Sequence, residues 1–138
     1  MRYYLDTNIL IFVLSNDKDE LNSQILNILE DYSNTFYLSA VVLKELILLY
    51  KEGKLKHLKY KNHKDLFVAI DELNYEVKTV TKKHFFAYAE LISAEGHRDP
   101  NDHLIIAQAI SDKMPLISSD REFKNYTSQG LEFIFNKR

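Results

Sequence analysis

The chain has 138 residues, of which 46% are apolar and 28% charged, and its formal net charge is −2. That length and composition are typical of one globular domain spanning residues 1–138, and the slight negative charge excludes a general attraction to phosphate. The absence of cysteine excludes disulfides, thiolate metal sites and cysteine nucleophiles and favours a cytoplasmic setting, and no apolar run is long enough for a membrane span.

The first half of the chain predicts two strands and two helices. Residues 3–5 predict a short buried strand, and apolar side chains recur at helical spacing between residues 21 and 32. Residues 36–38 predict a second strand. A helix should follow over residues 39–51, because its first residue is a serine that can act as N-cap and Gly53 lies just past its end.

The second half continues the alternation of helices and strands. Helical patterns cover residues 66–73, 81–92 and 99–112, and the last of these opens with the strong start signal Asp99-Pro100. Further strands are predicted over residues 77–80, 115–118 and 131–135. Strands that alternate with helices indicate an α/β fold, in which a parallel sheet of four to five strands is covered on both faces.

Four acidic residues lie at the junctions of these elements. Asp6 follows the first strand and Asp120 follows the strand at 115–118. Glu45 lies about two turns into its helix, and Asp102 lies in the first turn of another. Because sites in open α/β sheets form at the carboxyl ends of the strands, we expect the four carboxylates to gather at one edge of the sheet.

Clustered carboxylates need a cation. Two of them about 4 Å apart repel by roughly 4 kcal/mol at an effective dielectric near 20. Ligation by oxygen alone favours Mg²⁺ or Mn²⁺ over zinc, and such an ion can activate a water for in-line attack on phosphorus. Thr7, Asn8 and Ser118 could orient the ligands or the attacking water from a second shell.

Each acid also has a purely structural explanation. Asp6 could cap the helix that follows it, and Glu45 could belong to the solvated face of an amphipathic helix. Asp102 could complete a capping box, and Asp120 could be an ordinary turn residue. We assign Asp99 to the helix cap, close to the metal site but outside the ligand set. Joint placement of the other four is what favours a metal centre.

Four segments of the chain resemble the PIN-domain family, particularly the VapC-type toxins of bacterial toxin–antitoxin pairs. They are residues 4–10 (YLDTNIL), 39–46 (SAVVLKEL), 97–109 (HRDPNDHLIIAQA) and 116–123 (LISSDREF), in the family's order. The resemblance implies a three-layer α/β/α fold and a Mg²⁺- or Mn²⁺-dependent ribonuclease that forms homodimers and is inhibited by a cognate antitoxin. The positions that match the family's acidic residues are Asp6, Glu45, Asp102 and Asp120.

The leading hypothesis is therefore a metal-dependent endoribonuclease that acts as a toxin on RNA. The alternative is a catalytically inactive PIN-like domain that binds RNA or has a regulatory role. In that case the acids would have structural roles. A phosphatase-type motif at Asp6 is the least favoured hypothesis. Such enzymes normally carry a second acid two residues after the first, and that position is Asn8 here.

Two regions are candidates for contact with RNA or partners. Residues 51–64 are rich in lysine and could bind phosphates through Lys54, Lys56, Lys59 and Lys61, or could simply be a solvated surface. His97 and Arg98 precede the acidic helix and should border the crevice. Apolar side chains at residues 9–14 exceed what one helix face needs and could serve a dimer or antitoxin interface, although core burial is the default.

Overall fold

The structure, a computed structural model, describes residues 1–138 and contains one five-stranded parallel sheet. The strands are β1 (Arg2–Leu5), β2 (Thr35–Ser39), β3 (Glu76–Lys78), β4 (Leu116–Ser118) and β5 (Phe133–Phe135). Their order across the sheet is β3-β2-β1-β4-β5, so successive strands are added on one side of β1 as far as β3 and then on its other side from β4, which makes the β1–β4 boundary the topological switch point. The predicted α/β fold with a parallel sheet of four to five strands is confirmed.

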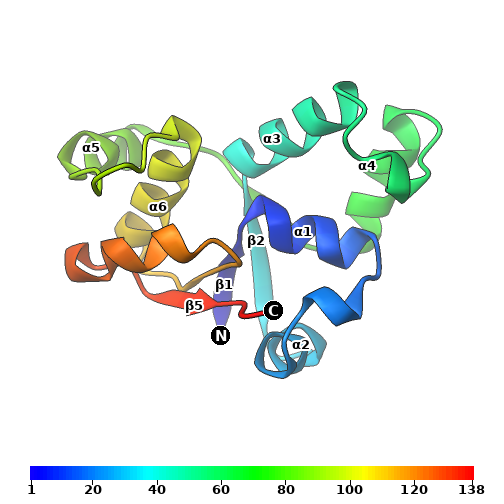
Figure 1. Ribbon diagram of the computed structural model, residues 1–138, viewed down its shortest axis with the longest axis horizontal. Helices are drawn as coiled ribbons and strands as arrows, with labels where there is room; N and C mark the ends of the chain where they lie inside the picture. The colour runs from blue at the N-terminus through cyan, green and yellow to red at the C-terminus, as the bar shows by residue number, and fades with distance from the viewer.

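Helices cover both faces of the sheet (Figure 1). They are α1 (Thr7–Leu14), α2 (Ser23–Glu30), α3 (Ala40–Lys51), α4 (His63–Glu72), α5 (Lys82–Glu90) and α6 (Pro100–Asp112). Three 3₁₀ segments complete the fold: η1 (Lys18–Glu20), η2 (Lys56–Leu58) and η3 (Arg121–Gln129). In Figure 1, α5 and α6 lie on one side of the central strands, and α1 and α2 lie on the other. None of the helices combines the length and the apolar composition that crossing a bilayer requires.

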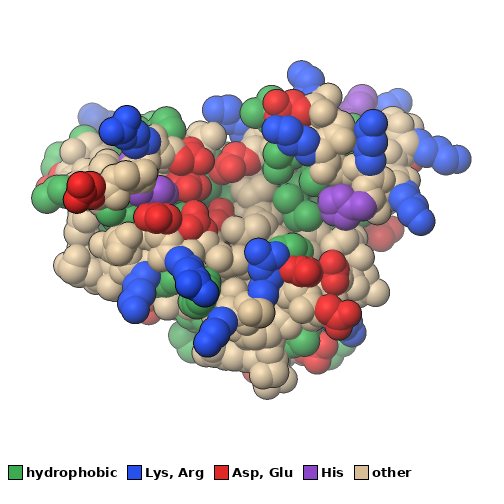
Figure 2. Space-filling view, in the orientation of Figure 1, with side chains coloured by type: hydrophobic (Ala, Val, Ile, Leu, Met, Phe, Trp, Pro, Cys, Tyr) green, Lys and Arg blue, Asp and Glu red, His purple; other side chains and the backbone are tan.

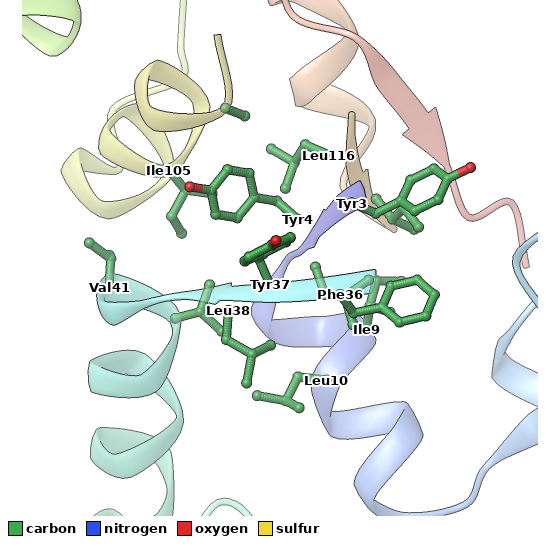
Figure 3. Close-up of a cluster of buried hydrophobic side chains, with 14 of the residues drawn as sticks. Tyr3, Tyr4, Ile9, Leu10, Phe36, Tyr37, Leu38, Val41, Ile105 and Leu116 are labelled. Atoms are coloured by element: carbon green, nitrogen blue, oxygen red, sulfur yellow. The ribbon is translucent and has the colours of Figure 1, made fainter. Parts of the chain in front are cut away.

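The core lies on both sides of the two central strands. Every residue of β4 and the last three residues of β1 are buried, as expected where a parallel sheet is covered on both faces. Figure 3 shows Tyr4 directed toward Ile105 of α6, and Leu38 of β2 beside Leu10 of α1. Full burial of each such aliphatic side chain contributes about 1.5–3 kcal/mol, so β1 and β4 form a rigid base for the residues at their ends.

Local capping fixes where the two helices that carry site acids begin. The Ser39 hydroxyl accepts a hydrogen bond from the Val41 amide at 3.1 Å and starts α3. The Asp99 carboxylate accepts from the Asn101 amide at 2.9 Å, and Pro100 occupies the first turn of α6. The N-cap positions predicted for Ser39 and Asp99 are therefore confirmed, and they set the register of Glu45 and Asp102 on their helices.

Two helical predictions extend too far. The helix predicted over residues 81–92 ends at Glu90, because the Gln129 side chain bonds both the amide (2.9 Å) and the carbonyl (2.7 Å) of Ile92. Ile92 is left exposed. In the region 21–32, Asn22 caps α2 through the Ile25 amide at 2.9 Å, and Tyr32 lies outside the helix in solvent.

Candidate active site

The four acidic residues approach the same edge of the sheet from four different elements. Asp6 directly follows β1, and its amide donates to the Ile117 carbonyl of β4 at 3.0 Å. Asp120 lies two residues beyond β4, Glu45 on α3 and Asp102 in the first turn of α6. Figure 2 shows acidic side chains gathered between the α5–α6 side of the molecule and α3. The gathering expected from the topology is thus present.

Asp6 is the most restrained of the four carboxylates. Only 4% of its surface is exposed. One carboxylate oxygen accepts the Thr7 amide at 2.8 Å, which caps α1. The other accepts the Ser118 hydroxyl at 2.6 Å and the Asn8 side-chain amide at 3.2 Å. Asp6 therefore serves as a helix cap and keeps one oxygen oriented by two polar side chains.

The same side chains tie Asp120 to this cluster. The Ser118 hydroxyl accepts a hydrogen bond from the Asp120 backbone amide at 3.0 Å, while the Asn8 side-chain Oδ1 accepts one from the Ser119 backbone amide at 3.1 Å. The Asp120 carboxylate accepts the Glu122 amide at 2.9 Å and caps η3. Asn8 and Ser118 thus hold the segments after β1 and β4 in a fixed relation and orient the two acids that those segments carry.

Burial and mutual repulsion raise the pKa values of three of these acids, Asp6, Glu45 and Asp102. Burial raises the pKa of Asp6 from its ordinary 3.8 to about 6; the Ser118 hydrogen bond opposes this rise, while the charges of Asp102 and Asp120 add to it. Burial, followed by the charges of Asp6, Asp102 and Asp99, raises the pKa of Glu45 to about 7. Burial also raises the pKa of Asp102. Near neutral pH, these three acids are ionised together at low cost only when a cation is present.

The oxygen atoms of the cluster have capacity for such a cation. One carboxylate oxygen of Glu45 is buried and has no hydrogen-bond partner, a costly arrangement unless something else binds it. The hydroxyl of Thr7 is also buried without a partner. The available donors are mainly carboxylates and hydroxyls, with one imidazole from His97 beside Asp102 and no thiolate in the chain, and this oxygen-rich set fits Mg²⁺ or Mn²⁺.

His97 is part of this cluster in a way that differs from its predicted role. Its side chain is buried, with Nδ1 2.7 Å from the Tyr126 hydroxyl and Nε2 3.1 Å from a carboxylate oxygen of Asp102. Both ring nitrogens are engaged inside the protein, so neither is free for a phosphate, and a contact of His97 with RNA stays an untested prediction. The ring instead orients Asp102, and one potential ligand atom from each of His97, Asp102 and Asp120 lies within 4.8 Å of the others.

The contribution of Tyr126 was not predicted. Its hydroxyl contacts His97 and accepts a hydrogen bond from the Ala94 amide at 3.0 Å. Tyr126 lies on η3, a segment over which the sequence predicts no element, and nothing set it apart from the eight other tyrosines of the chain. No signal in the sequence could have identified it.

The other residues proposed to contact RNA are on the surface. Arg98 is exposed next to Asp99, at the edge of the acidic cluster. The lysines at 54, 56, 59 and 61 are exposed on the connection between α3 and α4. Their contact with RNA stays a prediction.

The fold is shared with solved VapBC structures. Chains of VapBC2 from Rickettsia felis and VapBC-1 from nontypeable Haemophilus influenzae are 24% and 23% identical, with TM-scores of 0.68 and 0.69. A chain of VapBC from Salmonella typhimurium is 20% identical, with a TM-score of 0.71. The alignments cover 99%, 100% and 99% of this chain and 100%, 100% and 99% of those chains, respectively. A search of curated proteins gives no match.

Comparison of the sequence with models of protein families identifies the family of this chain. The family model described as "PIN domain" matches residues 3–128, which is nearly the whole chain and includes all four acids. The family match, the shared fold and the predicted acidic cluster all indicate the same kind of domain. The chain belongs to the PIN-domain family.

Proposed function

We propose that this chain, acting as a single domain, is a Mg²⁺- or Mn²⁺-dependent endoribonuclease and the toxin of a toxin–antitoxin pair. The observation that carries the proposal is the convergence of Asp6, Glu45, Asp102 and Asp120 from four elements. The pKa of Asp6 rises to about 6 and that of Glu45 to about 7, and Glu45 retains a buried oxygen without a partner. A carboxylate cluster that only stabilised helices would not require such an arrangement.

Each residue has a distinct part in this proposal. Asp6, Asp102 and Asp120 would hold the metal, with Glu45 ligating directly or through water. A divalent ion held there would make a bound water more acidic and would offset the charge on the leaving oxygen of the phosphodiester. Ser118 and Asn8 hold one oxygen of Asp6 toward the site. His97 orients Asp102 from the buried side, so the protein fixes its ligands before metal and RNA arrive.

The toxin assignment has separate support. The sequence resembles VapC-type toxins, and the whole chain shares its fold with chains solved in VapBC structures. Two of those structures contain bound DNA, from the promoter in the Rickettsia case. By this likeness we propose a cognate antitoxin as partner and a homodimer as the assembly of this chain.

The test is cleavage of single-stranded RNA by the purified protein. Cleavage should require Mg²⁺ or Mn²⁺, stop with chelator, and disappear in Asp6→Asn. Asp71→Asn is the matched control, since Asp71 is an exposed acid on α4 away from the cluster. Cleavage that survives both the chelator and Asp6→Asn would exclude this mechanism, and RNA binding without turnover would favour the inactive, regulatory alternative.

A further inference from the structure

A second feature lies beside the acidic cluster, at the β5 edge of the sheet. It is a groove of about 600 Å³, within the usual range for ligand pockets. Its lining comes from η3, β5 and the residues that follow: Arg121, Lys124, Thr127, Phe133, Phe135 and Lys137. Figure 2 shows Lys and Arg side chains over the η3 and β5 region, next to the acidic group. None of the functional roles assigned above uses this groove.

The groove is positively charged and its charges are unpaired. Arg121, Lys124 and Lys137 are exposed, and none of them takes part in an ion pair. No acidic residue lines the groove. In a chain of net charge −2, three free cations around one hollow form a local site for anionic groups.

The floor of the groove is aromatic. Phe133 and Phe135 are two residues apart on β5, so their rings lie on the same face of the sheet, with centroids 5.9 Å apart. Both rings are only partly buried. The Arg121 guanidinium lies 5.9 Å from the centre of the Phe135 ring. Partly exposed rings flanked by cations are the arrangement on which unpaired bases stack while their phosphates contact Lys and Arg.

The groove is directly connected to the acidic cluster. Arg121 follows Asp120 in the chain, and Phe135 pairs with Ser118 across the parallel β4–β5 ladder. The Asn136 amide donates to the Ser118 carbonyl at 2.8 Å. Since neighbouring strands lie about 4.8 Å apart, Phe135 begins one strand away from the serine that orients Asp6.

We propose that this cation–aromatic groove binds the single-stranded RNA that flanks the scissile phosphodiester. Bases stack on Phe133 and Phe135, and phosphates contact Arg121, Lys124 and Lys137. The inference rests on the proposed ribonuclease function and names where its substrate lies. Free anions satisfy only the charges, and an acidic peptide does not need stacking, so the combination of rings and cations favours RNA.

The test measures affinity for a short, fluorescently labelled single-stranded RNA by anisotropy, in an Asp6→Asn background that leaves the RNA uncut. Lys124→Gln/Lys137→Gln should weaken binding at least fivefold. It should also reduce the slope of log affinity against log salt concentration by about 1.4, because each phosphate contact on a single strand contributes about 0.7 to that slope. The matched control is Arg2→Gln/Lys113→Asn. It removes the same charge from exposed residues at the start of β1 and just before β4, the opposite end of the sheet.

A second variant separates stacking from charge. Phe135→Leu should lower RNA affinity about fivefold to 150-fold, the range for loss of a stacked base, and should leave the salt dependence of binding unchanged. Its melting temperature, measured alongside, shows whether the fold is retained. The partly exposed position of Phe135 and the apolar replacement favour retention.

The outcomes distinguish the groove from the ribonuclease proposal. Equal losses in Lys124→Gln/Lys137→Gln and in the Arg2→Gln/Lys113→Asn control would overturn the groove, as would RNA affinity unchanged in the Lys124→Gln/Lys137→Gln variant. If that variant keeps RNA affinity but loses affinity for polyglutamate, the groove is a site for acidic peptides and the inference is wrong. If RNA binding depends on the groove but no metal supports cleavage, the groove stands and the ribonuclease proposal fails.

Discussion

Replacement of Asp6 by asparagine should stabilise the metal-free protein at neutral pH while abolishing activity. Burial holds the pKa of Asp6 at about 6, against its ordinary 3.8. At about 1.4 kcal/mol for each pKa unit, ionised Asp6 lowers the free energy of unfolding by about 3 kcal/mol. Asparagine can still accept the hydrogen bond from the Thr7 amide that caps α1. It loses the hydrogen bond that Asp6 accepts from the Ser118 hydroxyl, which is worth about 1 kcal/mol. The expected net gain is about 2 kcal/mol.

The sign of the pH dependence follows from proton binding. Between about pH 3.8 and pH 6, the folded protein holds a proton on Asp6 that the unfolded chain has lost, so stability falls as pH rises. In urea denaturation without metal, the free energy of unfolding of Asp6→Asn should therefore increase relative to that of the wild type from pH 4.5 to pH 7. The difference between Asp71→Asn and the wild type should not change with pH. A constant difference across that range would refute the burial argument. Saturating Mn²⁺, at about 100 times its Kd, should stabilise the wild type by about 2.7 kcal/mol and Asp6→Asn far less.

Three further variants test the neighbouring groups. In the wild type, Mn²⁺ affinity measured by calorimetry should rise through about pH 7 as Glu45 ionises. Glu45→Gln should flatten that rise, and a pH profile of Mn²⁺ affinity equal to that of the wild type would exclude Glu45 as a ligand. Ser118→Ala removes the hydrogen bond that lowers the pKa of Asp6, so the pH at which urea stability falls should move upward, and a downward shift would contradict its role. Thr7→Val removes a buried hydroxyl without a partner, so stability should hold or rise by about 1 kcal/mol, whereas a loss of several kcal/mol would reveal a missing partner.

The acids and the main elements could be predicted because each has a local cause. Asp6 and Asp120 follow apolar strand segments, and Ser39 and Asp99 carry capping signals that place Glu45 and Asp102 on their helices. The topology rule for parallel sheets then brings strand ends together. Local signals plus one fold rule were enough to predict that the four acids gather at one edge of the sheet, and their role as metal ligands stays a prediction.

Features that depend on distant partners could not be predicted. The end of α5 is set by the Gln129 side chain, which lies far along the chain from Ile92. The burial of His97 depends on Tyr126, which lies on η3, 29 residues further along the chain. The raised pKa of Glu45 reflects burial and the charges of three other acids, which only the folded chain brings together.

The most direct test of the metal centre is a crystal soaked with Mn²⁺ and measured at its absorption edge. The anomalous signal should lie among the carboxylates of Asp6, Glu45, Asp102 and Asp120, and it should be lost in Asp6→Asn. An anomalous signal elsewhere, or none at concentrations of Mn²⁺ that support RNA cleavage, would contradict the assignment of these four acids as the metal site.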